Sequence, residues 1–146
     1  MMETMTFESG AKREVKDGRG RYDLIPMDIV EEVHEYATKN GVDDKTIIEV
    51  LSMALPKLAK HYENGAKVHG ERNWEKGIKI SSYVSSMWRH LIAYCAGETD
   101  EDHLTALIWN AMGASWTQER MPQMVDMPVR ANVEELFAKK VYGRYA

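Results

Sequence analysis

The sequence predicts an all-α protein, a compact helical bundle of four to five helices that follows an extended N-terminal arm. Apolar residues recur every three or four positions in four separate segments, which is the period of an amphipathic helix. Capping residues precede most of these segments, and glycines end several of them. No polar–apolar alternation of convincing length indicates a strand. We therefore expect residues 1–22 to form the arm and residues 23–146 to form a single all-α domain.

Composition and charge narrow the class of protein. The 146 residues, 44% of them hydrophobic, suffice for one domain with its own core. A net charge of −4 argues against a general nucleic-acid binder, so no stable nucleic-acid partner is expected. No apolar run approaches the roughly 20 residues of a membrane span, and no signal-peptide pattern opens the chain. We therefore expect no association with a membrane. The single cysteine, Cys95, can form no internal disulfide, so the protein is expected in a reducing cytoplasm.

The arm is rich in glycine and basic residues and has few large apolar side chains, which is typical of an extended or flexible segment. Its basic cluster, Lys16, Arg19 and Arg21, would suit an anionic ligand. A merely solvated tail is the alternative.

Helix boundaries follow from capping residues, glycines and prolines. Pro26 favours the start of the first helix, and Pro56 inside the second predicts either a kink or two abutting helices. The second helix is expected to fray near residues 65–70, where glycines begin. The expected caps are Asp43 or Asp44 for the second helix, Ser81 or Ser82 for the third, and Thr99 for the fourth. The expected helices cover about 27–39, 43–64, 81–96, 99–118 and 133–140.

The stretch from Glu63 to Gly77, ENGAKVHGERNWEKG, combines glycines, cations and anions where no helical period is apparent. Such a mixture is typical of a binding site on a loop, with a plain polar loop between helices as the alternative. Lys67 and Arg72 are cations of the kind that hold phosphates. Trp74 would either stack on a nucleobase or anchor the loop on the core.

Acidic residues gather where the fourth helix is expected to start. Glu98, Glu101 and Asp102 share one helical face if that helix begins early. Carboxylates placed so closely repel one another unless a cation such as Mg²⁺ holds them, although acids in a first turn also cap the helix. His90 and Asn110 add polar side chains inside the third and fourth helices. They indicate either satisfied core polar groups or a site shared between the two helices.

Four segments together resemble the phage dATP/dGTP diphosphohydrolase family, which includes the MazG-like enzymes called MazZ. They are GAKREVKDGRGRYDLIP at 10–26, GAKVHGERNWEKG at 65–77, RHL at 89–91 and GETDEDHLTALIWN at 97–110. The resemblance spans roughly residues 10–118. It implies an all-α catalytic domain that cleaves purine deoxynucleoside triphosphates, dGTP or dATP, into the monophosphate and pyrophosphate with Mg²⁺ or Mn²⁺. It also implies a role in phage modified-nucleotide metabolism, in the host cytoplasm.

The MazG-like superfamily carries paired E-x-x-E and E-x-x-D motifs, and this chain departs from that pattern. Glu98 and Glu101 have the E-x-x-E spacing, but no E-x-x-D follows. On the resemblance we expect Glu63, Glu98 and Asp102 to be catalytic, and these three with Glu101 to bind the metal. The expected substrate-binding residues are Arg21, Lys67, Arg72, Asn73, Trp74, His90, His103 and Asn110.

A homodimer or homotetramer is expected, because four short helices form a thin core and such sites are often completed at interfaces. Two other classes of function stay open at this point. A non-catalytic nucleotide- or nucleic-acid-binding protein would use the basic arm and Trp74. A purely structural helical bundle would account for the ten methionines and four tryptophans, but not for the stretch from Glu63 to Gly77.

Overall fold

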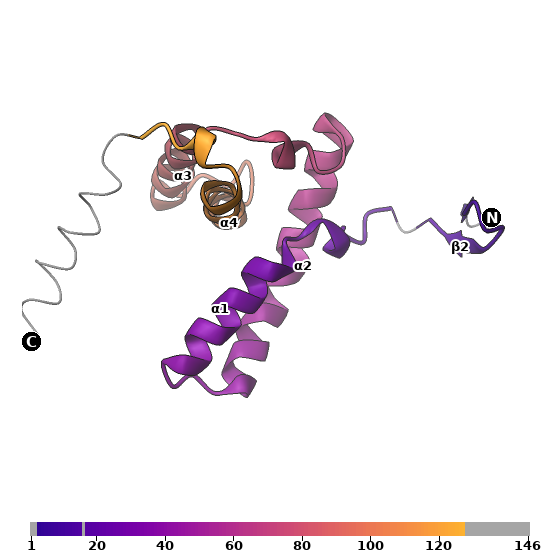
Figure 1. Cartoon of the computed structure of the whole chain (residues 1–146), viewed down its shortest axis with the longest axis horizontal. Coiled ribbons are helices and arrows are strands. Elements are labelled where there is room, and N and C mark those ends of the chain that lie inside the picture. Colours follow the sequence, from indigo (N-terminus) through magenta and orange to yellow (C-terminus); the bar gives the residue numbers. More distant parts are fainter. Residues whose placement is uncertain (1–2, 16, 128–146) are drawn as a thin grey trace, which may run out of the picture.

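The computed structural model describes residues 3–15 and 17–127, and within them it is built mainly from four α-helices (Figure 1). The expected helix over about 133–140 lies outside the described residues. The helices are α1 (Met27–Lys39), α2 (Asp44–His69), α3 (Ile80–Cys95) and α4 (His103–Arg120). Three short 3₁₀ turns are η1 (Tyr22–Leu24), η2 (Asn73–Lys76) and η3 (Pro122–Met124). The predicted all-α class is therefore confirmed.

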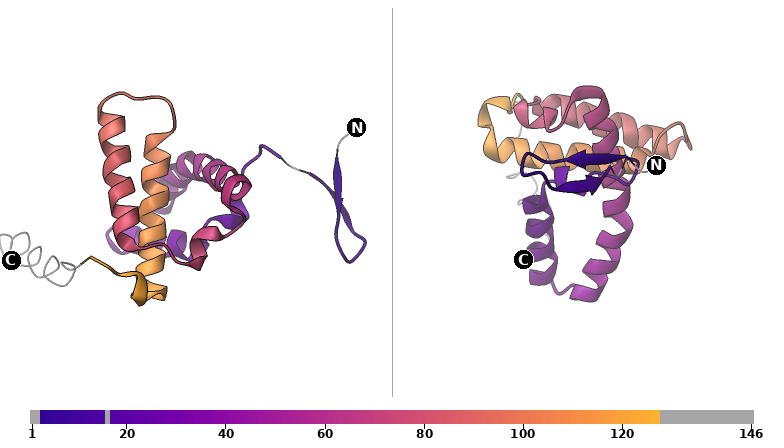
Figure 2. Two further views of the ribbon diagram at one scale, coloured as in Figure 1. Left: turned by 90° about the horizontal axis from the view of Figure 1, so that it is seen from above. Right: turned by 90° about the vertical axis from the view of Figure 1, so that its right-hand side faces the viewer.

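The four helices form two antiparallel hairpins that cross each other. Figure 2 shows α3 and α4 side by side, joined at one end by the loop of residues 96–102. α1 and α2 form the other hairpin, and only the later half of α2 approaches α4 (Figure 1). No helix of the described residues is long and apolar enough to cross a membrane.

Two aspartates set where α2 and α4 begin. Asp43 accepts a hydrogen bond from the backbone N–H of Thr46 at 3.0 Å, as expected of the cap of α2. Asp102 accepts one from the N–H of Thr105 at 3.0 Å in the same way. The expected start of the fourth helix at Thr99 is thus wrong, because the side chain of Asp102 caps a helix that begins one residue later. The acidic residues before α4 lie on a loop rather than on one helical face.

The remaining boundaries show a second difference from expectation. α2 runs as one helix through Pro56 and continues to His69, so the predicted fraying near residues 65–70 is wrong. Seven residues of the stretch 63–77 therefore belong to α2, and only its second half is irregular. The helix ends at Gly70, whose φ of 89° is readily adopted by glycine alone. α3 begins at Ile80, and Ser81 bonds Asp126 rather than capping the helix end.

The main core lies where η1, the later half of α2 and η2 meet α4. Its buried members include Leu24, Leu58, Tyr62 and Trp74. A second cluster joins α3 to α4, with Tyr83 packed so closely on Gly113 that an added Cβ would lie 2.6 Å from the tyrosine ring. These contacts fix the later half of α2 beside the α3–α4 hairpin.

The arm is more ordered than the sequence indicates. Residues 4–6 and 12–14 pair as strands β1 (Thr4–Thr6) and β2 (Lys12–Glu14) in an antiparallel hairpin that projects away from the helices (Figure 1). These six residues, all of them exposed, form a small sheet that no alternation in the sequence indicated. A polar hairpin with no buried face leaves no apolar alternation for sequence analysis to detect.

Residues 17–25 then attach the arm to α2. The N–H of Arg21 donates to the carbonyl of Ala59 at 2.9 Å. The N–H groups of Gly18 and Gly20 donate to the carboxylate of Glu63 at 2.7 and 3.3 Å. Gly20, with φ 85°, lies so close to Ala59 that a Cβ there would be 2.9 Å from that side chain. This part of the arm is therefore a fixed wall beside α2.

Candidate active site

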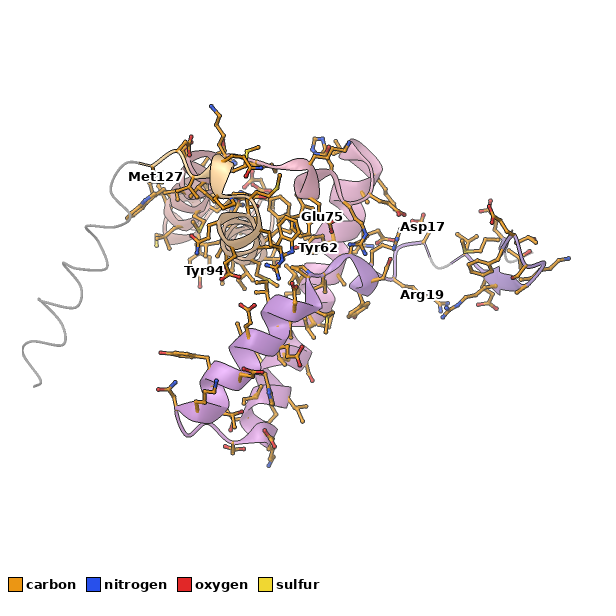
Figure 3. All side chains as sticks on the ribbon, viewed as in Figure 1. Asp17, Arg19, Tyr62, Glu75, Tyr94 and Met127 are labelled. Atoms are coloured by element: carbon orange, nitrogen blue, oxygen red, sulfur yellow. The ribbon has the colours of Figure 1, made fainter. Side chains whose placement is uncertain are left out.

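A cleft of about 1220 Å³ separates α2 from the α3–α4 hairpin. One face of α2 supplies Lys57, His61, Asn64 and Val68, which follow one another at three- or four-residue spacing. The attached arm, η2, α3 and the start of α4 supply the other walls. Figure 3 shows side chains crowded between α2 and α4, Tyr62 among them, and shows Asp17 and Arg19 on the segment that leads from the hairpin to α1. The cleft is large enough for a ligand of nucleotide size.

Consecutive carboxylates from Asp100 to Asp102 form the acidic end of the cleft. Asp102 accepts both the N–H and the hydroxyl of Thr105, at 3.0 and 2.8 Å. Burial alone would raise the pKa of Asp102, but the hydrogen bonds from Thr105 and the positive charge of Lys57 outweigh it and lower that pKa. Asp102 is therefore ionised at neutral pH while it holds the helix end.

Two buried histidines lie beside these carboxylates. His90 of α3 and His103 of α4 are each 5% exposed, and their Nδ1 atoms are 3.1 Å apart. Oε1 of Glu101 lies 3.4 Å from Nδ1 of His90 and 3.6 Å from Nδ1 of His103. Burial lowers the pKa of His90, so this imidazole is neutral at pH 7. Asp100, whose carboxylate is 2.9 Å from Nε2 of His103, has its pKa lowered by that hydrogen bond.

Aromatic side chains line the middle of the cleft. The rings of His61 and Trp109 both border it, with centroids 5.7 Å apart. Trp74 packs edge-on against Trp116 at 4.8 Å and is buried, which favours the alternative in which it anchors the irregular segment, and its contact with a substrate stays a prediction. Within the described residues its indole N–H has no hydrogen-bond partner. Trp109 also lines the cleft and is less buried than Trp74.

Cationic side chains surround the cleft on several elements: Arg19, Lys57, Lys60, Arg72 and Arg89. Lys60 is already used, since its Nζ donates to the carbonyl of Gly18 at 2.8 Å. Arg72 pairs with Glu75 at 2.7 Å. Among the described residues, Arg19, Lys57 and Arg89 have no carboxylate within 4.0 Å. These three are thus available for the charges of a phosphate chain.

The structure brings most of the sequence-predicted site residues to this cleft. Those that line it are Arg72, Asn73, Trp74, His90, Glu101, Asp102 and Asn110. Glu98 and His103 border a smaller adjoining pocket of about 450 Å³, which Glu101 and Asp102 also line. The amide of Asn110 donates to the carbonyl of Ala106 at 2.8 Å, so its nitrogen is already paired.

Three predicted residues line neither of these pockets and instead attach the arm. Glu63 is buried, and its carboxylate accepts the N–H groups of the arm described above. Lys67 pairs with Asp17 at 2.5 Å. Arg21 bonds Asp23 and, at 2.5 Å, Glu71. Neither Glu63 nor Asp102 belongs to any of the groups of potential metal ligands found within 4.8 Å of one another in the described part of the chain.

Sequence reasoning missed several residues that line the cleft, chiefly Lys57, His61, Arg89 and Trp109. A signal was present for two of them. Lys57 and His61 are four residues apart on α2, so they share a face and interrupt its apolar pattern. Trp109 fits the apolar period of α4 and could not be distinguished from a core residue without the fold.

Comparison with known families gives one match. Residues 38–127 match the family model described as dATP/dGTP diphosphohydrolase, N-terminal. This range is more than half of the chain and contains all the cleft residues that α2, α3 and α4 supply. No curated protein and no solved structure shows a significant match.

Proposed function

The chain belongs to the dATP/dGTP diphosphohydrolase family, and from this premise we propose that its cleft hydrolyses purine deoxynucleoside triphosphates, dGTP or dATP, in the presence of Mg²⁺ or Mn²⁺. One water is added across the bond between the α- and β-phosphates, which yields the nucleoside monophosphate and pyrophosphate. The observation that carries the proposal is the composition of this cleft, which combines carboxylates, cations that have no carboxylate partner among the described residues, and an aromatic wall.

The acidic end of the cleft carries carboxylates, which are the type of ligand that a hard divalent cation prefers. Glu101 and Asp102 line the cleft, and Glu98 lies at the adjoining pocket. Both oxygens of Asp102 accept hydrogen bonds from Thr105, so Asp102 would bind a cation through its remaining lone pairs. These three are the proposed ligands. A bound cation would neutralise the triphosphate and lower the pKa of a bound water. Glu63, also predicted as a ligand, would first have to release the N–H groups of Gly18 and Gly20, so its part stays a prediction.

The remaining walls of the cleft suit the other parts of the substrate. Lys57, Arg89 and Arg19 would bind the phosphate oxygens, and Arg72 would join them by exchanging its bond to Glu75. Trp109 and His61 offer ring faces for the base. Burial lowers the pKa of His61, which is therefore neutral and suited to stacking at pH 7. Asn73 and Asn110 supply polar groups for the base or the sugar.

The biological setting belongs to the proposal as well. The resemblance to phage enzymes supports a role in phage modified-nucleotide metabolism, where removal of one purine triphosphate would redirect the nucleotide pool. The family name supports the substrate class alone.

A nucleotide panel tests this function. The protein is incubated with each of the four deoxynucleoside triphosphates and with GTP and ATP, with Mg²⁺ or Mn²⁺, and the products are separated by anion exchange. We expect pyrophosphate and the monophosphate from dGTP or dATP, and a much slower reaction with pyrimidine nucleotides. Tight binding without any pyrophosphate release would instead identify a non-catalytic nucleotide-binding protein.

A further inference from the structure

The two facing histidines form a cluster that the carboxylate chemistry of the proposed function does not explain. His90 and His103 come from different helices, both are nine-tenths or more buried, and their Nδ1 atoms face each other at 3.1 Å. Oε1 of Glu101 faces both atoms, at 3.4 and 3.6 Å. Three potential ligand atoms thus surround one point at the end of the cleft.

Asp100 determines which nitrogen of His103 carries a proton. Its carboxylate oxygen can only accept, and it lies 2.9 Å from Nε2 of His103, so Nε2–H is the donor. In the neutral ring, Nδ1 of His103 then presents a lone pair toward His90. A carboxylate on the outer nitrogen is also the usual arrangement that orients a metal-bound histidine.

The spacing of the three atoms fits one coordination sphere. A four-coordinate ion with bonds of about 2.0–2.1 Å to nitrogen and oxygen places its ligands about 3.3–3.4 Å apart. The three observed separations, 3.1, 3.4 and 3.6 Å, bracket that value. A direct N–H···N bond between the two rings would explain the first distance, but not the approach of Glu101 to both.

We propose that Nδ1 of His90, Nδ1 of His103 and Oε1 of Glu101 bind one divalent first-row transition-metal ion of the Mn²⁺, Co²⁺ or Zn²⁺ class. Two imidazole ligands select such an ion over Mg²⁺, which prefers oxygen donors throughout. The remaining coordination position faces the cleft, because His90 and Glu101 both line it and Glu101 is 44% exposed. Water or a phosphate oxygen can occupy that position.

The site shares Glu101 with the proposed Mg²⁺ ligands, and the carboxylate has a second oxygen for that purpose. Any role of this ion in hydrolysis rests on the proposed function, whereas the binding of the ion to the three side chains does not. Binding is therefore measured without nucleotide.

The test is a titration of the untagged full-length protein with Co²⁺, followed by its visible absorption, in the presence of excess Mg²⁺. We expect one equivalent to bind with the intense absorption of a low-coordinate site. His90→Gln and His103→Gln are expected to lower the affinity by at least about 100-fold, and Asp100→Asn by about 10- to 100-fold, as for residues that orient a ligand. The matched control is His34→Gln, at a half-exposed position of α1 that lines neither pocket, and this variant should bind Co²⁺ as the wild type does.

A second measurement needs no variant and so does not depend on whether the substituted proteins fold. Nitrogen-15 NMR of the imidazoles in wild-type protein should show Zn²⁺ shifting Nδ1 of His90 and His103 while Nε2 of His103 stays protonated. Unmoved imidazole resonances, or Co²⁺ binding that survives both histidine substitutions, would overturn the site. A protein that hydrolyses dGTP with Mg²⁺ yet binds no Co²⁺ would refute this inference alone.

Discussion

At the scale of single residues, Asp102 combines a structural and a proposed catalytic part. Its carboxylate caps α4 through Thr105 and also borders the cleft. Asparagine caps a helix about as well as aspartate, so Asp102→Asn separates the two parts. We expect the variant to fold with an almost unchanged melting temperature and to turn over dGTP at least about tenfold more slowly, because a charged ligand is lost.

The chain offers a matched control for that substitution. Asp43 caps α2 through Thr46 with the same pair of hydrogen bonds, at 3.0 and 2.7 Å, but does not line the cleft. Asp43→Asn should therefore leave both stability and turnover close to those of the wild type. Unchanged turnover in Asp102→Asn would remove this residue from the proposed metal ligands, and equal losses in both variants would indicate an effect on folding.

Glu63 makes the attachment of the arm depend on pH. Its pKa is lowered chiefly by the hydrogen bond from the N–H of Gly18, although burial opposes this, and Lys60 adds to the lowering. A group whose folded-state pKa lies below its unfolded value stabilises the fold above the unfolded pKa. That contribution is lost as the pH falls through the folded-state pKa.

We therefore expect Glu63→Gln to weaken the arm at neutral pH, because the amide cannot accept both N–H groups. Amide hydrogen exchange at Gly18 and Gly20 should be faster in the variant than in the wild type at pH 7 once both are scaled to their intrinsic rates, and the difference should shrink in acid. Glu49→Gln, at an exposed position of the same helix, is the control. A difference that did not vary with pH would contradict the titration of Glu63.

The residue scale is also where sequence analysis succeeded only in part. Residue types were sufficient to select Arg72, Asn73, His90, Glu101 and Asp102, all of which line one cleft. They did not reveal that the carboxylate of Glu63 faces the arm, because this depends on backbone N–H groups more than 40 residues away in the chain. Such groups are invisible in a pattern of side chains.

At the scale of elements, the contact between α3 and α4 positions His90 against His103. Gly113 permits that contact, since an added Cβ would lie 2.6 Å from the ring of the fully buried Tyr83. Gly113→Ala should destabilise the protein by about 1–3 kcal/mol, the usual cost of overpacking a core. Urea denaturation measures this change in the free energy of unfolding.

Gly65→Ala is the matched control, because Gly65 also lies inside a helix but has no atom within 4 Å of an added Cβ. It should leave stability unchanged or raise it by up to about 1 kcal/mol through helix propensity. Equal effects of the two substitutions would show that the packing of Tyr83 on α4 does not limit the approach of the helices.

The presence of the four helices could be predicted from the apolar periodicity, whereas the start of α4 and the end of α2 could not. Thr99 and Asp102 are both acceptable caps, and only the hydrogen bond to Thr105 decides between them. Likewise, nothing in residues 63–69 shows that α2 continues, because glycine and charged residues there interrupt the helical repeat of apolar side chains. Packing of Tyr62 and Ala66 on the core holds this part of the helix.

At the scale of the whole molecule, the crossing of the two hairpins leaves apolar side chains exposed. Val33, Tyr36, Ile48 and Met53 on α1 and α2 are more than half exposed, as is Trp88 on α3. Surfaces of this kind fit subunit contacts, so a homodimer or homotetramer stays our prediction. Light scattering coupled to size exclusion should give a mass of two or four chains at micromolar concentration, and a monomer would contradict it.

The crossing itself was not predictable from local patterns, because the sequence indicates amphipathic faces but not which faces meet. The cleft arises only when the later half of α2 lies beside α3 and α4, and this brings residue 57 near residue 102. The family resemblance, rather than any spacing of residues, supplied the substrate, and the family match over residues 38–127 supports it.

Phosphorus-31 NMR of dGTP and dATP incubated with the protein and Mg²⁺ tests the central claim, hydrolysis between the α- and β-phosphates, most directly. The account predicts that the three triphosphate resonances decline together while those of the monophosphate and pyrophosphate grow in equal molar amounts. The reaction should slow at least about tenfold in Asp102→Asn and stay unchanged in Asp43→Asn. Orthophosphate with the diphosphate as products, or triphosphates that persist unchanged, would contradict it.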